Sequence, residues 1–381
     1  MRTLIRNACV IDTEPHPYAR HGIDVLIDGA TITQVAPGLP ADGAHIIDAT
    51  GRIVLPGLVD THRHTWQAAI RGTAYDTTFP AYLDRVVHGL APELTADDMY
   101  AGNLAGAREC LAGGVTTLLD WSHNQRTPAH TDAAVQALRD SGIRAVFGYA
   151  HPAPDRPRPD ELRRAHAMCG GLVRTVLAAW GPGFTDMAAT TADWRLAREL
   201  GIRISVHVNG AGPVARLAGA GLLGADTTYV HGNGVTDDEL RLIADTGGTA
   251  SITPLTESVL GMGAPEIARL RAYGVPTGIG ADAVTTVTGD LFAHMRSVLA
   301  FGRAADPTLT SADVLRMATL DGAATLGMAD RIGSLRPGKQ ADLALLRPHP
   351  GLAAAADPVA AVVATATAAD VESVLVAGVV G

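Results

Sequence analysis

Lysine is almost absent from this chain of 381 residues, because Lys339 is the one lysine among its 30 basic residues. This scarcity excludes lysine chemistry deep in the chain, including Schiff-base catalysis and a metal bridge built on a carboxylated lysine. Cysteine is scarce too. Cys9, Cys110 and Cys169 lie far apart with no C-x-x-C pair, so neither a disulfide framework nor a thiolate zinc site is expected.

Long apolar runs and an excess of positive charge are also missing. No window of about 18 uncharged apolar residues occurs, and the first six residues lack the apolar core of a signal peptide. We therefore expect a cytoplasmic protein with no membrane partner. The net charge of −9 argues against nucleic acid as a partner and leaves a small molecule as the expected substrate.

From residue 56 onward, apolar β-branched runs alternate with helical patterns. Thr95, Thr236 and Thr310 are expected to cap helices, and Thr131 to open another one. Eight strands alternating with helices over residues 56–335 predict a (β/α)₈ TIM barrel. A doubly wound open sheet competes, but no Gly-rich dinucleotide loop follows an early strand. The expected barrel strands are 55–60, 115–120, 143–149, 173–179, 202–208, 227–231, 249–252 and 277–281.

The two chain ends are expected to form a second unit. Residues 1–55 and 336–381 contain further β-prone runs, and Asp28-Gly29 is a hairpin turn signal between two of them. We predict a small β-sandwich-like domain beside the barrel. Its expected strands are 10–12, 24–27, 31–35, 342–346, 359–363 and 371–376.

Four strand ends carry side chains that can bind a metal. His62 and His64 end the first barrel strand, where alternation points both imidazoles toward the barrel axis at its carboxyl mouth. Taken singly, each such residue is more simply a hydrogen-bonded structural group, but together they favour a site for one divalent ion. Zn²⁺ is the expected ion, with Fe²⁺ or Mn²⁺ as alternatives. Three later strand ends carry His207, His231 and Asp282.

Two strings carry a resemblance to a known family: Pro56-Gly-Leu-Val-Asp-Thr-His-Arg-His64 and Gly333-Ser-Leu-Arg-Pro-Gly-Lys-Gln-Ala-Asp-Leu343. With the lone histidines and the aspartate, they resemble the amidohydrolase superfamily over nearly the whole chain. The nearest branch is the cytosine deaminase-like and chlorohydrolase-like group, which includes triazine hydrolases and S-adenosylhomocysteine deaminases.

The resemblance implies a role for each of the five residues at the strand ends. His231 would contact the metal-bound water, and Asp282 would accept its proton. It also leaves a homodimer open, which the sequence does not decide. The implied metal ligands are His62, His64, His207 and Asp282.

One position departs from this family pattern. Deaminases of this branch carry H-x-x-E after the fifth strand, where the glutamate protonates the ring nitrogen, but this chain has Gly210 in the glutamate's place. Losing a positioned acid costs about 10²–10⁴-fold in rate. Glu257, after the seventh strand, is the expected substitute, although a solvated loop glutamate is an equal alternative. His123, Asn124 and Asn209 are further candidates for contact with substrate.

The long connection after the first barrel strand is a candidate binding loop. Trp66 and Gln67 follow the metal ligands, and Tyr75, Phe79 and Tyr82 come soon after. Aromatic walls with an amide suit a flat polar ring, so Trp66 and Gln67 are expected to bind substrate. Packing of the loop on its own barrel is the alternative for the other three. Six histidines are expected at the surface: His88, His130, His151, His166, His294 and His349.

These patterns together predict a metal-dependent hydrolase that uses a metal-activated water on a small nitrogen heterocycle, by deamination or by displacement at a C–N bond. Because Gly210 cannot act as an acid, hydrolysis of a cyclic amide or a metal-assisted elimination or isomerisation is the alternative. A non-catalytic binding barrel is the remaining hypothesis, and retention of all the ligand positions disfavours it.

Overall fold

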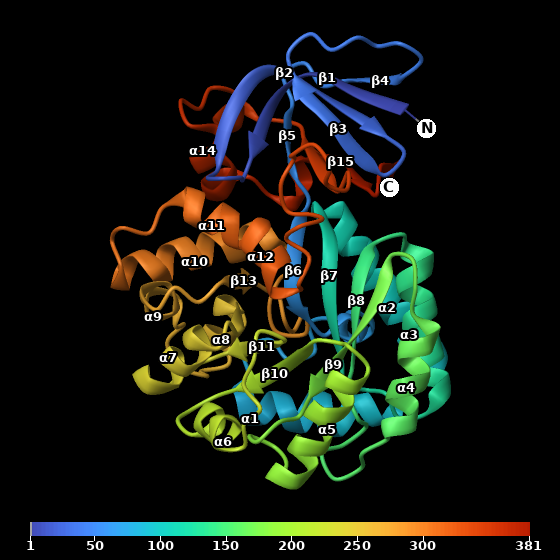
Figure 1. Cartoon of the computed structure of the whole chain (residues 1–381), viewed down its shortest axis with the longest axis vertical. Coiled ribbons are helices and arrows are strands. Elements are labelled where there is room, and N and C mark those ends of the chain that lie inside the picture. Colours follow the sequence, from blue (N-terminus) through green and yellow to red (C-terminus); the bar gives the residue numbers. More distant parts are fainter. Residues whose placement is uncertain (1) are drawn as a thin grey trace.

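The computed structural model describes residues 2–381 and contains a barrel with a separate sheet above it (Figure 1). Eight parallel strands close the barrel in the order β10-β11-β12-β13-β6-β7-β8-β9. This closure confirms the predicted (β/α)₈ architecture. The barrel strands are β6 (Leu58–Arg63), β7 (Val115–Ser122), β8 (Arg144–Tyr149), β9 (Val173–Ala179), β10 (Ile204–Val208), β11 (Thr227–His231), β12 (Thr249–Ile252) and β13 (Thr277–Ile279).

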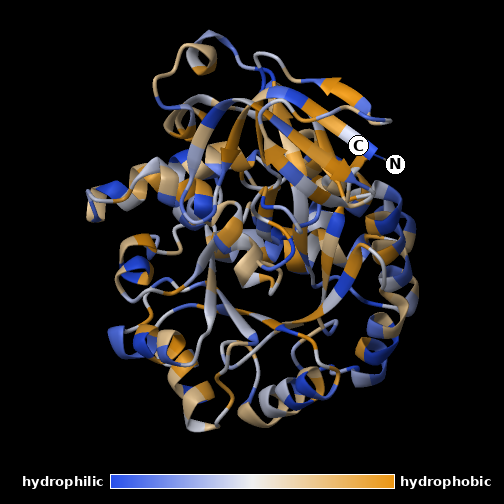
Figure 2. Cartoon of the chain, turned by 45° about the horizontal axis from the view of Figure 1, so that its top comes forward, coloured by the Kyte–Doolittle hydropathy of each residue, from blue (hydrophilic) through white to orange (hydrophobic). Residues whose placement is uncertain are grey.

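Helices surround the barrel, and they alternate hydrophilic and hydrophobic residues as a covering layer requires (Figure 2). Thr95, Thr236 and Thr310 each cap a helix with a reciprocal capping box, as their sequence context predicts. Thr131 does not open its helix, because Thr127 and Pro128 begin it one turn earlier. The main covering helices are α2 (Ala96–Ala112), α3 (Pro128–Ser141), α4 (Pro159–Met168), α5 (Met187–Glu199), α6 (Pro213–Gly219), α7 (Asp237–Asp245), α9 (Ile267–Ala272), α10 (Leu291–Ala305), α11 (Ser311–Met317) and α12 (Leu320–Thr325).

Short helices fill the loops at the carboxyl ends of two strands. Between β6 and α2 lie η1 (Thr65–Ile70), α1 (Phe79–Tyr82), the π-helix η2 (Leu83–Leu90) and η3 (Ala91–Glu93). After β12 comes α8 (Pro254–Val259). Both loops reach the site described below.

Both chain ends join one eight-stranded sheet, in the order β16-β15-β14-β5-β1-β2-β3 with β4 paired to β1. The Asp28-Gly29 turn connects β2 to β3, as expected, and the two termini lie close together in Figure 1. The strands are β1 (Arg2–Asp12), β2 (Tyr18–Asp28), β3 (Thr31–Ala36), β4 (His45–Asp48), β5 (Ile53–Pro56), β14 (Leu343–Leu346), β15 (Val371–Val376) and β16 (Val379–Val380).

One expected strand is wrong, because residues 359–363 lie in the helix α14 (Pro358–Thr365). The Asp357 side chain accepts a hydrogen bond from the Ala360 amide at 3.0 Å, and Pro358 occupies the first helical turn. Val362 and Val363 are buried against the main core. An N-cap, a proline at the first position and burial on a helical face therefore outweigh the β propensity of valine. Two short helices complete this end of the chain: α13 (Pro350–Ala353) and η4 (Ala368–Asp370).

A buried ion pair joins the barrel to the terminal sheet. Arg144 at the start of β8 donates two hydrogen bonds to Asp342, at 2.6 and 2.9 Å. Asp342 also accepts from the Ala377 amide at 2.7 Å. Both charged side chains are almost fully buried, so the charge of each is neutralised by the other rather than by water. Within residues 2–381, no helix is both long and apolar enough to cross a bilayer.

Candidate active site

Five polar side chains meet at the carboxyl end of the barrel. His62 lies on β6 and His64 follows it, while His207 and His231 lie on β10 and β11. Asp282 comes three residues after β13 and forms an isolated bridge with Arg63. Strand ends that are far apart in sequence are therefore brought to a common point, as their positions in the pattern suggested.

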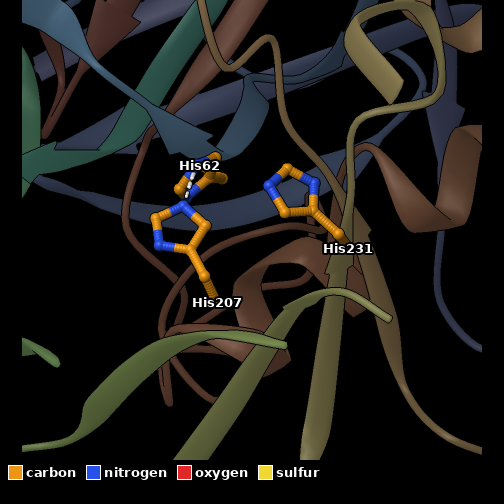
Figure 3. A group of neighbouring side chains, drawn as sticks. All are labelled: His62, His207 and His231. Carbon is orange, nitrogen blue, oxygen red and sulfur yellow. Dashed lines mark hydrogen bonds between the residues drawn. The ribbon is translucent and has the colours of Figure 1, made fainter. Parts of the chain in front are cut away.

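Two overlapping groups of three among these side chains are close enough to hold a metal ion. The Nε2 atoms of His62 and His207 are 3.2 Å apart and their rings are nearly perpendicular, with His231 beside them in Figure 3. Asp282 Oδ1 lies 3.4 Å from His62 Nε2 and 3.3 Å from His64 Nε2. One group consists of His62, His207 and His231, and the other of His62, His64 and Asp282. Within each group the candidate ligand atoms lie within 4.8 Å of one another.

The charge states of these groups suit a divalent cation. Burial lowers the pKa of His62 to about 4 and holds the pKa of His207 well below its usual value. These imidazoles are therefore neutral at pH 7, with lone pairs free for a metal. Burial would raise the pKa of Asp282, but hydrogen bonding to His62 and the adjacent imidazoles keep it below its usual range. The site thus offers neutral nitrogen donors and one carboxylate.

Buried polar groups hold the backbone of the ligands in place. Asp60 Oδ1 accepts hydrogen bonds from the amides of His62 at 3.3 Å and Ala281 at 3.1 Å, and so ties β6 to the segment before Asp282. Arg63, which lies between His62 and His64 in the chain and is fully buried, pairs with Asp60 and with Glu109 on α2. Asp60 and Arg63, which belong to the same short string as His62 and His64, therefore fix the backbone that carries these two histidines.

Glu257 lies behind His231 and has no exposed surface. Its Oε1 is 3.2 Å from His231 Nδ1 and accepts from the Thr253 amide at 2.8 Å. Its Oε2 accepts from Asn233 Nδ2 at 3.4 Å. Burial disfavours the imidazolium of His231, but Glu257 and the charge of Asp282 raise its pKa above the usual value. The carboxylate thus fixes Nδ1 as the protonated nitrogen and leaves Nε2 free.

A pocket opens above the five side chains, and its walls are mostly apolar. Its cavity volume is about 70 Å³, which is room for only a few water molecules. His123 and Asn209 reach this pocket, and Asp282 is the one carboxylate in it. The other walls come from Phe79, Tyr82, Leu83, Val87, Trp121, Trp180, Phe184, Leu260, Met262 and Ala283.

Three residues predicted to bind substrate are not part of this lining. Trp66 and Gln67 are fully buried, and the Gln67 amide connects Tyr82 Oη at 2.6 Å with Thr285 Oγ1 at 2.9 Å. Asn124 donates instead to the carbonyl of Ala91 at 3.0 Å. These side chains lie behind the wall, where they support the loop that forms it.

The structure also adds residues that the sequence did not single out. Trp180 and Phe184, after β9, line the pocket, and no motif marks them. The expectation of surface histidines is wrong for His130, His151 and His294, which are buried. Hydrogen bonds to other segments hold His130 and His151, for example His151 to Asp193 at 3.1 Å, and His294 Nε2 lies 2.9 Å from the Thr288 carbonyl oxygen. A helix or loop position alone does not reveal such contacts.

Relatives of known name cover most of this chain. It is 34% identical over 359 residues to a 5-methylthioadenosine/S-adenosylhomocysteine deaminase of Symbiobacterium thermophilum, covering 85% of this chain and 81% of the relative. A 5'-deoxyadenosine deaminase of Methanothermobacter thermautotrophicus is 29% identical over 405 residues, covering 98% of this chain and 92% of the relative.

Solved structures share the whole architecture. An adenosine deaminase from Xanthomonas campestris with bound zinc has a TM-score of 0.90 at 25% identity, covering 99% of this chain and 92% of that chain. An atrazine chlorohydrolase from Arthrobacter aurescens, complexed with zinc and atraton, has a TM-score of 0.91 at 23% identity and the same fold, covering 99% and 94% of the two chains. Together with the cluster of imidazoles and a carboxylate, the zinc-bound neighbours support a divalent metal here.

A family model assigns the chain directly. Residues 53–381, from the last strand of the amino-terminal segment to the end of the chain, match the model of the amidohydrolase family. The match spans the whole barrel together with the strands that the carboxyl end adds to the terminal sheet. The chain therefore belongs to the amidohydrolase family and is a hydrolase with the (β/α)₈ fold.

Proposed function

We propose that this chain is a zinc-dependent deaminase that hydrolyses the exocyclic C–N bond of a small purine-like heterocycle with an uncharged substituent. The observation that carries the proposal is the convergence of His62, His64, His207 and Asp282 beneath a pocket with apolar walls. The relatives named as 5-methylthioadenosine/S-adenosylhomocysteine and 5'-deoxyadenosine deaminases support this reaction.

The donor set fits one zinc ion. His62, His64, His207 and Asp282 would hold it, since three neutral imidazoles and a carboxylate are ligands that zinc accepts, and Fe²⁺ or Mn²⁺ accept them too. When bound, the metal supplies an activated water by lowering the pKa of that water toward about 7. The neutral state of His62 and His207 is the feature of this chain that favours binding.

Side chains of this protein accept and transfer the proton of the attacking water. Asp282 accepts it on its carboxylate, and Thr253 Oγ1, 3.4 Å from Asp282 Oδ2, steadies that oxygen. His231 lines the pocket with Nδ1 held by Glu257, so its Nε2 is the atom available for orienting the attack. The new bond joins the water oxygen to the ring carbon, and the amino group leaves as ammonia with the transferred proton.

Glu257 acts in this proposal as a positioning residue. The sequence suggested that it replaces the missing acid at position 210, but its carboxylate is fully buried and does not line the pocket. Contact with His231, Thr253 and Asn233 instead suits a group that orients the imidazole. His123 also lines the pocket, and its Nδ1 lies 3.1 Å from Nδ1 of His64.

Displacement of a leaving group that needs no proton is the second candidate. Gly210 has no side chain, and Asp282 is the one carboxylate lining the pocket. A halide departs without protonation, so the missing acid costs such a reaction less than it costs deamination. A chlorinated triazine is therefore the appropriate comparison substrate.

The test is a turnover assay on metal-free and zinc-loaded protein. 5-Methylthioadenosine, 5'-deoxyadenosine and atrazine are supplied separately in ¹⁸O-water, and ammonia, chloride and product mass are measured. We expect ammonia and one ¹⁸O per product from an adenine substrate, with zinc-loaded protein only. Chloride release without ammonia would favour displacement, and no turnover of any substrate by zinc-loaded protein would refute the proposal.

A further inference from the structure

We propose that a second site, on the opposite face of the barrel, binds an oxyanion of the phosphate class. The site is the basal cavity, a hollow of about 660 Å³. It lies among the first residues of β8 and β9, the segment just before β10, and the turn after α12. Its main polar lining residues are His166, Arg174, Thr175 and Arg203.

The charge of the basal cavity is of one sign. Arg174 and Arg203 line it, and no aspartate or glutamate is among the lining residues. This is unusual in a chain whose net charge is −9. A concave surface lined by cations alone concentrates anions from solution.

Three polar atoms around the basal cavity lack partners. Nε and Nη2 of Arg203 and Nδ1 of His166 are buried without a hydrogen bond within residues 2–381. An unpaired buried donor costs about 1–3 kcal/mol, and more when it is charged. Three such atoms, on two residues that line the same cavity, favour a bound group there, because buried polar atoms in proteins are usually satisfied.

No acid of the described chain neutralises Arg203. Asp226 is the acid whose charge acts on it, but Asp226 is already paired with Arg198, whose Nε lies 2.7 Å from Oδ2. Arg203 itself forms no ion pair within 4.0 Å among the residues described. A half-buried guanidinium without a counter-charge favours binding of an anion from outside the chain.

The surrounding backbone leaves space for the arginine. Gly327 adopts φ +66, and a Cβ added there would lie 3.0 Å from Arg203 Cδ and 3.4 Å from Nη1. A larger residue would therefore press on the guanidinium. Gly170, Gly171 and Gly201 also line the cavity, and because they have no side chains they do not narrow it.

Phosphate is the oxyanion that matches this arrangement. A guanidinium presents paired donors whose spacing fits two oxygens of a phosphate, and two guanidiniums match its double charge. The cavity is larger than one phosphate ion, so a monoester can place its phosphate against the arginines and its ester group toward solvent. Inorganic phosphate and a phosphate monoester are the two sources that the experiment must separate.

Calorimetric titration of the full chain with potassium phosphate tests the proposal, with potassium chloride at equal ionic strength as reference. We expect saturable binding of phosphate that is at least tenfold weaker in Arg203→Met and in Arg174→Glu. Arg241→Met removes an exposed arginine that pairs only with Asp238, and it should bind phosphate as the wild type does. Phenyl phosphate is titrated in parallel, and tighter binding than inorganic phosphate would identify a monoester as the ligand.

Three results would overturn the proposal: no saturable heat with either phosphate compound, an equal response to chloride, or equal weakening by the control. If Arg203→Met does not fold, the titration of Arg174→Glu decides the question, because Arg174 is exposed and its substitution leaves the interior unchanged. The measurement uses no turnover, so its outcome is independent of the proposed deaminase activity.

Discussion

Asp282 and His231 both adopt left-handed backbone conformations, with φ of 59 and 69. Such angles cost about 1–3 kcal/mol for a residue with a side chain, and they persist where the surroundings impose them. Here the amide of Asp282 donates to the His62 carbonyl at 2.8 Å, and its own carbonyl accepts from His64 at 3.0 Å. The strain places both side chains over the barrel mouth, which is what a preorganised site requires.

Substitution of Asp282 tests its two proposed tasks together. Asp282→Asn keeps the shape but removes the negative ligand and the proton acceptor, so we expect kcat to fall by about 10²–10⁴-fold or more. Bound zinc, measured by elemental analysis, should fall as well, while the circular dichroism spectrum should stay unchanged. Activity like that of the wild type would show that another group takes the proton.

The role of Glu257 is tested by removing its charge alone. Glu257→Gln retains an oxygen for His231 Nδ1 but loses the negative charge, so we expect kcat to fall at least tenfold with KM nearly constant. Glu257→Asp, which restores the charge, should recover part of this loss. Glu266→Gln is the control, since Glu266 accepts from the Gly234 amide and contacts no site histidine. Equal rates for wild type and Glu257→Gln would remove Glu257 from the mechanism.

At the scale of elements, the segment between β6 and α2 is the wall of the pocket. Its first part is internal support, because Trp66 packs in a separate apolar cluster with Tyr82 and Val86. Its second part, α1 with the π-helix η2, presents Phe79 and Leu83 to the pocket. These side chains therefore limit the space that a substrate can occupy in the pocket. π-Helices occur often at such functional positions.

Shortening a wall residue should therefore change selectivity. Leu83→Ala enlarges the pocket, and we expect kcat/KM for 5-methylthioadenosine to rise about tenfold relative to 5'-deoxyadenosine, since one or two methylene groups are worth about 1–3 kcal/mol. Val86→Ala is the matched control, because Val86 lies in the same helix but is buried away from the pocket. That variant should lower stability and leave the ratio unchanged. The same ratio in wild type and Leu83→Ala would place the substituent elsewhere.

At the scale of the whole molecule, the two chain ends hold the barrel and the terminal sheet together. Arg144 and Asp342 form the buried link between barrel and sheet, and a second link joins the two chain ends to each other, with Glu14 2.9 Å from Lys339 and 2.7 Å from Arg336. The string at 333–343 thus contributes Asp342 to the junction between barrel and sheet. Asp342, within this string, accepts hydrogen bonds from both the Arg144 side chain and the Ala377 amide at that junction.

Breaking the buried link should be costly. Asp342→Asn leaves Arg144 buried without a counter-charge, and we expect the free energy of unfolding to fall by about 3–5 kcal/mol in urea titrations. Asp238→Asn, which breaks the exposed pair with Arg241, should cost less than about 1 kcal/mol. Equal effects of the two substitutions would show that Asp342 is not the junction.

The second link makes stability depend on pH. Burial alone would raise the pKa of Glu14, but hydrogen bonds from Lys339, Ser334 and Arg336 lower it from 4.5 to about 2. The ionised form is thus favoured by folding, so its contribution is complete above pH 4.5 and is lost as the pH falls toward 2. Because the link is partly exposed, we expect a contribution of only about 1 kcal/mol.

Urea unfolding of wild type and Glu14→Gln measures this contribution. The two should differ by about 1 kcal/mol at pH 7 and converge as the pH approaches 2.5. Glu199→Gln, which breaks an ion pair within the barrel, controls for charge loss in general. A difference that stays constant from pH 7 to 2.5 would contradict the assignment to Glu14.

The sequence by itself determined the barrel and the placement of the candidate metal-binding residues at its strand ends. Strands 173–179, 227–231 and 249–252 are where the pattern places them, and three threonine caps start their helices, because alternation and capping depend on near neighbours. The positions of His62, His64, His207 and Asp282 at strand ends follow from the same local rules.

Only the tertiary structure decided which side chains share the pocket. Trp66 and Gln67 follow the ligands closely in sequence but lie behind the wall, while Trp180 and Phe184 reach the pocket from the loop after β9. Glu257 meets His231 across 26 residues. Loop conformation is set by contacts between segments distant in the chain, and these contacts leave no periodic trace in the residues themselves.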